Sequence, residues 1–161
     1  MKTRLRFAAI AVAAAVPLSL STGVASAYDT PSYPPPPYEQ TGGEGCTPGY
    51  WKNHTDSWER YAPSSSVRSV FSAATGDLGS ATLLQALSSK GGNGVDGASR
   101  ILLRAATAAV LNAADDDVDY AFTSSRIIAD VNAALRTGDR SVILALATTL
   151  DDANNAGCTL N

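Results

Sequence analysis

The chain has 161 residues, with 12 lysines and arginines, 15 aspartates and glutamates, two cysteines and one histidine. This length suits one domain of ordinary size, and a 45% share of hydrophobic residues is enough to form a core. One histidine and two cysteines exclude most zinc sites and any cofactor that a Cys/His cluster would hold, so we expect no metal or cofactor. A formal net charge of −3 argues against a nucleic acid partner, because such binders normally carry a basic face.

Residues 1–27 have the layout of a secretory signal peptide. Three basic residues within the first six positions precede an apolar run over residues 7–20, and an Ala-Ser-Ala stretch ends at Ala27. A membrane anchor is the weaker alternative, because the run is short and Pro17 interrupts it. We therefore predict a secreted, extracellular protein with no membrane insertion. Its mature form has 134 residues, of which 9 are basic and 15 acidic, since three bases and no acids lie in the signal.

Residues 28–45 form what we call the Pro/Tyr arm, with five prolines, three tyrosines and three glycines. The proline run favours an extended polyproline II conformation, and Gly42 and Gly43 are expected to act as a swivel. The arm is either a spacer or a recognition element, because aromatic side chains beside a pre-extended segment supply contact area at low ordering cost. The candidate partner-binding residues of the arm are Tyr33, Pro34, Pro35, Pro36, Pro37 and Tyr38.

The remaining residues, 46–161, are predicted to form a small all-α bundle. Apolar residues repeat at helical spacing over 98–114, which is expected to bury one broad face. A second helix is expected between an N-cap at Thr123 and a C-cap at Gly138, and a third between Asp139 and Gly157. Shorter helices are expected around residues 67–73 and 81–88.

Residues 91–97 read Gly-Gly-Asn-Gly-Val-Asp-Gly and are predicted to be a flexible loop, since they offer little side chain for packing. This stretch is not a phosphate-binding loop, because it lacks the Lys-Ser/Thr ending and no strand precedes it.

Cys46 begins the helical domain and Cys158 lies three residues before the end of the chain. In an exported protein two cysteines most often pair, and neither has the C-x-x-C spacing of a redox site. A disulfide would close a loop of about 112 residues, for which chain entropy gives at most ~4.7 kcal/mol of stabilisation.

The stretch from Gly45 to His54, GCTPGYWKNH, concentrates the chemistry of the chain. Thr47 and Pro48 suit a helix start. Two interpretations stay open: an aromatic cluster that closes the bundle near the disulfide, or a general base or metal ligand at His54 that works with an acidic neighbour. No nucleophile or second ligand has suitable spacing, so no catalytic residue and no metal site is assigned. The candidate partner-binding residues of this stretch are Tyr50, Trp51 and His54. The acidic neighbours that could assist His54 are Asp56 and Glu59.

Residues 115–119 read Asp-Asp-Asp-Val-Asp and match the first acidic positions of a calcium-binding EF-hand loop. The EF-hand is rejected, because Tyr120 stands where glycine is needed and Arg126 stands where a glutamate is needed. A solvated acidic turn is the expected structure, and weak divalent binding stays open.

Four stretches of this sequence resemble a family of small exported bacterial modules. The resemblance implies a secreted helical domain with paired terminal cysteines and brings no catalytic residues. The stretches, which together span residues 45–158, are GCTPGYWKNH at 45–54, ILLR with LNAA at 101–104 and 111–114, VNAAL at 131–135, and LD with NNAGC at 150–151 and 154–158.

A narrower resemblance, of layout alone, is to the small adaptor subunit of the umbrella toxin particles of actinobacteria. In those particles the adaptor joins a lectin-like subunit to a large repeat-containing toxin, and an extended adaptor segment enters a lectin cleft. This resemblance implies a non-enzymatic adaptor that binds other secreted proteins in an antibacterial toxin complex. The alternatives are a secreted enzyme or metal-dependent hydrolase at His54, and a cell-surface or matrix structural module without a defined partner.

Overall fold

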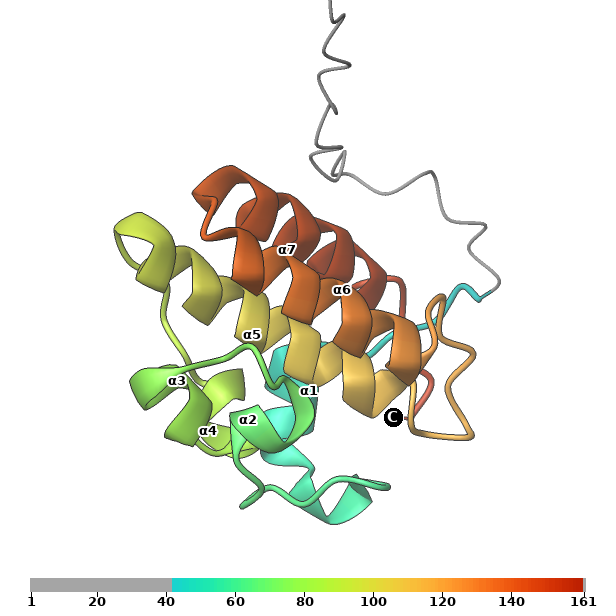
Figure 1. Cartoon of the computed structure of the whole chain (residues 1–161). Coiled ribbons are helices and arrows are strands. Elements are labelled where there is room, and N and C mark those ends of the chain that lie inside the picture. The colour runs from blue at the N-terminus through green and yellow to red at the C-terminus, as the bar shows by residue number, and fades with distance from the viewer. Residues whose placement is uncertain (1–41, 161) are drawn as a thin grey trace, which may run out of the picture. The chain divides into compact units, whose positions relative to one another are not determined.

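A computed structural model describes residues 42–160, so the predicted signal peptide and residues 28–41 of the Pro/Tyr arm lie outside it. The described residues form seven α-helices and one 3₁₀ helix, and the prediction of an all-α fold is confirmed (Figure 1). The elements in chain order are α1 (Pro48–Asn53), the 3₁₀ helix η1 (Thr55–Ser57), α2 (Val67–Val70), α3 (Gly76–Ser80), α4 (Leu83–Leu87), α5 (Gly94–Asn112), α6 (Ser124–Thr137) and α7 (Arg140–Asn154).

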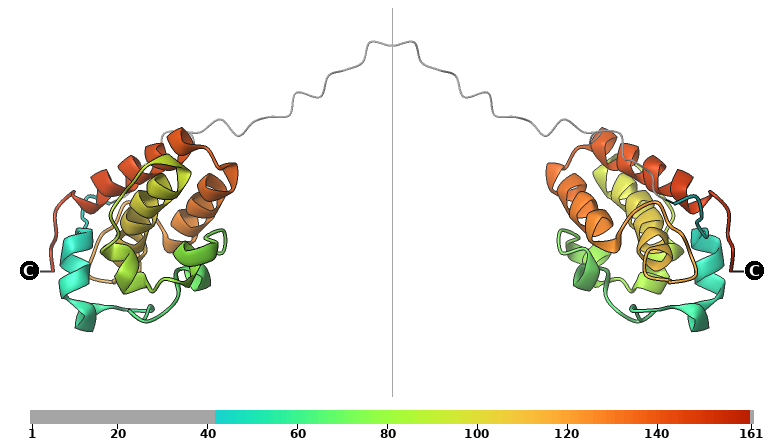
Figure 2. Two further views of the ribbon diagram at one scale, coloured as in Figure 1. Left: turned by 90° about the vertical axis from the view of Figure 1, so that its left-hand side faces the viewer. Right: turned by 90° about the vertical axis from the view of Figure 1, so that its right-hand side faces the viewer.

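Helix α5 is the centre of the bundle. It contacts α7, α6, α4 and α1, and Figures 1 and 2 show it lying between the two other long helices and the short helices α1–α4. Every residue from 105 to 112 is buried, so neighbouring elements enclose this part of α5 on all sides. The prediction that one face of the helix is buried was therefore too narrow. Alanines make this possible, because their small side chains let neighbouring helices approach closely. The alanines fully or almost fully buried on this helix are Ala98, Ala105, Ala106, Ala108 and Ala109.

Local capping signals fix both ends of α6 and the start of α7 where the sequence predicts them. The Thr123 hydroxyl accepts a hydrogen bond from the Arg126 N–H at 3.3 Å at the start of α6. Gly138 ends α6 with a left-handed φ of 62°, which glycine adopts without steric cost. The Asp139 carboxylate accepts from the Ser141 and Val142 N–H groups at 2.7 and 3.3 Å and begins α7. All three predicted caps are therefore confirmed.

The glycine-rich loop prediction is wrong in its second half. Helix α5 begins at Gly94, so residues 94–97 are helical and only residues 91–93 remain a connection. Gly97 lies against the backbone of Gly92 with no room for a Cβ atom, and Asp96 pairs with Arg100 at 3.0 Å one turn along the helix. The small residues thus allow close contact between two backbone segments rather than backbone flexibility.

The other boundaries differ from the predictions more modestly. Only Val67–Val70 and Leu83–Leu87 of the two expected short segments are helical, and α3 at Gly76–Ser80 was not predicted. Helix α7 ends at Asn154, three residues before Gly157. These short helices depend on packing and on single caps, such as the reciprocal hydrogen bonds of Thr82 and Gln85 that begin α4.

The last residues of the predicted arm, 42–45, belong to the helical body. Glu44 forms a parallel bridge with Tyr120, and Gly45 forms an antiparallel bridge with Gly157. A Cβ atom on Gly42 would collide with the backbone of Asp119, so this glycine permits a close approach. Gly42 is therefore a fixed contact in this structure and not the swivel that composition suggested.

The cap at Asp139 makes stability dependent on pH. Hydrogen bonds from the Ser141 hydroxyl and then from the Ser141 and Val142 N–H groups hold the pKa of this carboxyl below its ordinary value. The pKa of this carboxyl is lower in the folded state than in the unfolded state. The cap therefore stabilises the fold at pH values above the unfolded pKa of about 4, and this stabilisation is lost as the pH falls through the folded-state pKa.

We expect D139A to lower the melting temperature at pH 7 and to have a smaller effect at pH 2.5. Thermal unfolding followed by circular dichroism measures both differences. T123A is the matched control, because a hydroxyl cap does not titrate and its effect on the melting temperature is expected to stay the same. A D139A effect of equal size at both pH values would contradict this account of the cap.

Candidate functional site

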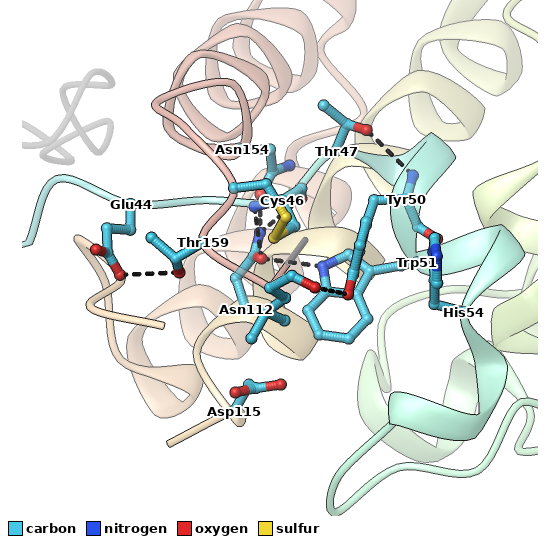
Figure 3. The surroundings of a disulfide bond; sticks show 12 residues. Glu44, Cys46, Thr47, Tyr50, Trp51, His54, Asn112, Asp115, Asn154 and Thr159 are labelled. Atoms are coloured by element: carbon cyan, nitrogen blue, oxygen red, sulfur yellow. Dashed lines mark hydrogen bonds between the residues drawn. A yellow bond between two sulfur atoms is a disulfide. The ribbon is translucent and has the colours of Figure 1, made fainter. Parts of the chain in front are cut away.

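Residues 45–54 are organised by one buried side chain, Asn112 at the end of α5. Its Oδ1 accepts hydrogen bonds from the Cys46 N–H at 2.8 Å and the Trp51 indole N–H at 2.9 Å. Its Nδ2 donates to the Cys46 carbonyl at 2.9 Å and to Asn154 Oδ1 at 3.0 Å. Asn112 is fully buried, and Figure 3 shows its amide between Cys46 and the Trp51 ring. This amide fastens the start of the domain to the central helix.

A second buried amide, Asn154 at the end of α7, continues the network. Its Oδ1 also accepts from the Tyr120 hydroxyl at 2.8 Å, and its Nδ2 donates to the Ala105 carbonyl at 2.9 Å. Burial, and to a smaller extent the Asp151 carboxylate, raises the pKa of Tyr120 well above its ordinary value. Tyr120 therefore stays neutral and remains a donor at any physiological pH.

The predicted disulfide between Cys46 and Cys158 is confirmed. It lies beside the two amides, where the start of the domain meets its end (Figure 3). The Gly45 N–H donates to the Gly157 carbonyl at 2.8 Å, and the Tyr50 hydroxyl donates to the Leu160 carbonyl at 3.0 Å. The two ends of the described chain are thus joined covalently and by hydrogen bonds.

The aromatic residues form a cluster at this junction, as one of the two open interpretations predicted. Helix α1 begins at the Thr47 cap with Pro48 in its first turn and ends at Asn53, so Trp58 is not on the same helix as Tyr50. Instead the Trp58 indole N–H donates to the Trp51 carbonyl at 2.9 Å. Trp51 is fully buried and is a core residue, so it offers no contact area to a partner in this conformation.

His54 is exposed and stacks on Tyr50, with ring centroids 4.1 Å apart and an interplanar angle of 17°. Its Nδ1 lies 2.9 Å from the Tyr50 carbonyl oxygen, so one ring nitrogen is already used in closing α1. Asp56 and Glu59, the acidic residues expected to assist it, are exposed. Within residues 42–160, no three His, Cys, Asp or Glu side chains gather closely enough to hold a metal ion.

The acidic stretch at residues 115–119 forms a turn that its own carboxylates stabilise. Asp115 Oδ1 accepts from the Asp117 N–H at 2.9 Å, and Asp116 pairs with Arg60 at 3.2 Å on the surface. The Asp119 N–H donates to Glu44 Oε2 at 2.9 Å, which ties this turn to residues 42–45. The expected acidic turn is therefore present, with Asp116, Asp117 and Asp119 exposed as predicted but Asp115 buried. Its contacts are with other residues of this chain.

Of the predicted site residues, the structure brings together Tyr50, Trp51 and His54 beside the disulfide, whereas Tyr33, Tyr38 and the prolines between them lie outside the described residues. Sequence reasoning missed the organising role of Asn112 and Asn154. The available signal was a single amide on the apolar face of an alanine-rich helix, a place where an unpaired polar group would be costly.

The part of the chain that the structure describes contains no helix long and apolar enough to cross a bilayer. In comparisons with known proteins, no family model, no curated protein and no solved structure matches this chain.

Proposed function

We propose that this chain is a secreted, non-enzymatic adaptor whose helical body holds the Pro/Tyr arm at one fixed point for capture by another secreted protein. The observation that carries the proposal is the fastening of residues 42–46. These residues bridge Tyr120 on one side and Gly157 on the other, and Cys46 is held by the Asn112 amide and by the disulfide. A spacer does not need such a precise attachment.

The rigid attachment favours binding by the arm because it lowers the conformational entropy that the arm loses when it binds. A partner that takes an extended segment must restrict that segment's freedom, and this cost falls when one end is already anchored to a folded body. Tyr33 and Tyr38 flank the four prolines, which exclude helix and confine the preceding residues to extended geometry. The two tyrosines are therefore the proposed anchors, with the prolines as a stiff spacer between them.

The alternative of an enzyme was centred on His54, the only histidine of the chain. Its ring stacks on Tyr50 and its Nδ1 lies 2.9 Å from the Tyr50 carbonyl oxygen, which favours a structural use of this side chain. Half-buried Tyr50 and exposed His54 are instead the alternative contact surface, to which binding would move if the arm were only a spacer.

In its narrower form, the proposal places the chain in an antibacterial toxin particle. The layout of a signal peptide, an extended arm and a small acidic helical body supports it. The partners would then be a lectin-like subunit, which takes the arm, and a large repeat-containing toxin. A cell-surface or matrix module would share the same fold but would have no defined partner.

Co-purification from the culture medium of a producing strain tests the proposal. The mature chain with a C-terminal affinity tag is expected to bring down specific secreted proteins, and deletion of residues 28–41 is expected to abolish at least one of them. H54A is the matched body control and is expected to retain that partner. Recovery of the wild-type chain alone, or the same partners from wild type and deletion, would overturn the role of the arm.

A further inference from the structure

The last four described residues, 157–160, form a segment that we call the C-terminal strap. It follows Asn155 and Ala156, which are hydrogen-bonded to the end of α7, and its Leu160 packs against the apolar cluster that contains Trp51 and Cys46. Its non-covalent hold is light. The Gly157 carbonyl accepts from Gly45, the Leu160 carbonyl accepts from Tyr50, and the exposed Thr159 hydroxyl has two long contacts at 3.3 and 3.4 Å.

The two sides of the disulfide are held very differently. Cys46 is fully buried, and both its N–H and its carbonyl are bonded to Asn112, so it stays in place without the sulfur bond. Cys158 is half-buried and belongs to the strap. The end of α7 is also secure, because Asn154 is fully buried with partners on α5 and at Tyr120.

These contacts place a hinge at Gly157. The Asn155 N–H still donates to the Asp151 and Asp152 carbonyls and the Ala156 N–H to the Ala153 carbonyl, so both residues stay bonded to the end of α7. Gly157 has a φ of 129°, which favours glycine, and the disulfide fixes the next residue. Without that bond, the strap depends on the hydrogen bonds from Gly45 and Tyr50 to its carbonyls, on the two long Thr159 contacts and on the packing of Leu160.

We propose that the disulfide makes residues 157–160 a redox-opened strap, which a dithiol reductant releases while the helical body stays folded. A thiolate of the reductant attacks the sulfur of Cys158, the less buried of the two cysteines, and the Cys46 sulfur leaves as a thiolate that takes up a proton. The second thiol of the reductant then attacks the mixed disulfide and releases Cys158 as a thiol. In sum the reductant becomes a disulfide, and the protein gains two electrons and two protons.

Opening the strap uncovers an apolar surface that the oxidised protein hides. Cys158 and Leu160 pack against a cluster of Cys46, Trp51, Leu87, Ala108 and Leu111, and the Tyr50 hydroxyl loses its partner when they leave. The reduced protein would therefore present a contact surface next to the attachment point of the arm. This inference concerns the body alone and is independent of whether the arm binds a partner.

Thiol labelling and hydrogen exchange on the mature protein test the strap. On titration with dithiothreitol, Cys158 is expected to react with iodoacetamide at least about tenfold faster than Cys46, because Cys158 moves with the opened strap whereas Asn112 holds Cys46 in place in the apolar cluster. Amide exchange of Gly45, whose N–H donates to the Gly157 carbonyl, is expected to rise on reduction, while exchange within α5 stays slow and the helical circular dichroism signal is retained. C158S is the matched variant and is expected to show rapid exchange at Gly45 without reductant.

Two results would overturn the proposal. If both thiols react at the same rate as the helical signal disappears, the disulfide holds the whole body and not a strap. If Gly45 keeps its slow exchange after complete reduction, the hydrogen bonds and Leu160 suffice to hold the strap closed.

Discussion

Replacing Asn112 by alanine is expected to lower the free energy of unfolding by about 3–5 kcal/mol. The substitution leaves the Cys46 N–H, the Cys46 carbonyl and the Trp51 indole N–H without their partner, and an unsatisfied buried polar group costs about 1–3 kcal/mol. It also removes the donor to Asn154 and leaves a cavity at the end of α5. Urea unfolding followed by circular dichroism measures the loss.

N132A is the matched control for this prediction. Asn132 is also a nearly buried helical asparagine, but its Oδ1 accepts one hydrogen bond, from the Ala73 N–H at 2.8 Å. We expect N132A to cost about 1 kcal/mol, the usual net value of one hydrogen bond. Equal losses for N112A and N132A would mean that the buried amide at the junction is not the structural centre described above.

The second large effect is expected on removal of the disulfide. Cys46 and Cys158 are 112 residues apart in sequence, so the bond restricts most of the unfolded chain. The chain-entropy relation gives an upper value near ~4.7 kcal/mol, and we expect a loss of about 2–4 kcal/mol in the free energy of unfolding. Urea unfolding with and without dithiothreitol measures it, and the mass of the intact oxidised protein should be about two hydrogens lower than that of the reduced form.

The double variant C46S/C158S supplies the control, since its unfolding should not respond to dithiothreitol. Because the bond acts mainly on the unfolded state, the native helical signal of the variant is expected to match that of the oxidised protein. Free thiols at both cysteines in the protein recovered from the culture medium would contradict the disulfide that joins the two ends of the body.

The long helices could be predicted because their signals are local. Thr123, Gly138 and Asp139 cap α6 and α7 through contacts within three residues, and the apolar spacing between the caps indicates the buried faces. The start of α5 could not be predicted in this way. Its glycines favour a loop by composition, and the contact of Gly97 with the Gly92 backbone becomes visible only after the chain has folded.

The candidate site was only partly predictable for a related reason. The pairing of the cysteines was predicted from the expected export of the chain, and the aromatic cluster from the crowding of residues 50–58. The partners of Asn112, by contrast, are 66, 61 and 42 residues away, and no local pattern encodes those distances. The only trace in the sequence is an amide on an apolar face, which indicates a buried hydrogen bond without naming its partner.

The central claim is that the arm binds and the body presents it, and the most direct test is the affinity of the captured partner for matched variants. Titration calorimetry with the wild-type mature chain, with Y33A/Y38A and with H54A separates the two surfaces. We expect Y33A/Y38A to weaken binding by more than ~2 kcal/mol, which is the loss expected of buried hot spots, and H54A to change it little. Wild-type affinity in Y33A/Y38A, with a loss in H54A, would contradict the claim and move the binding surface to the body.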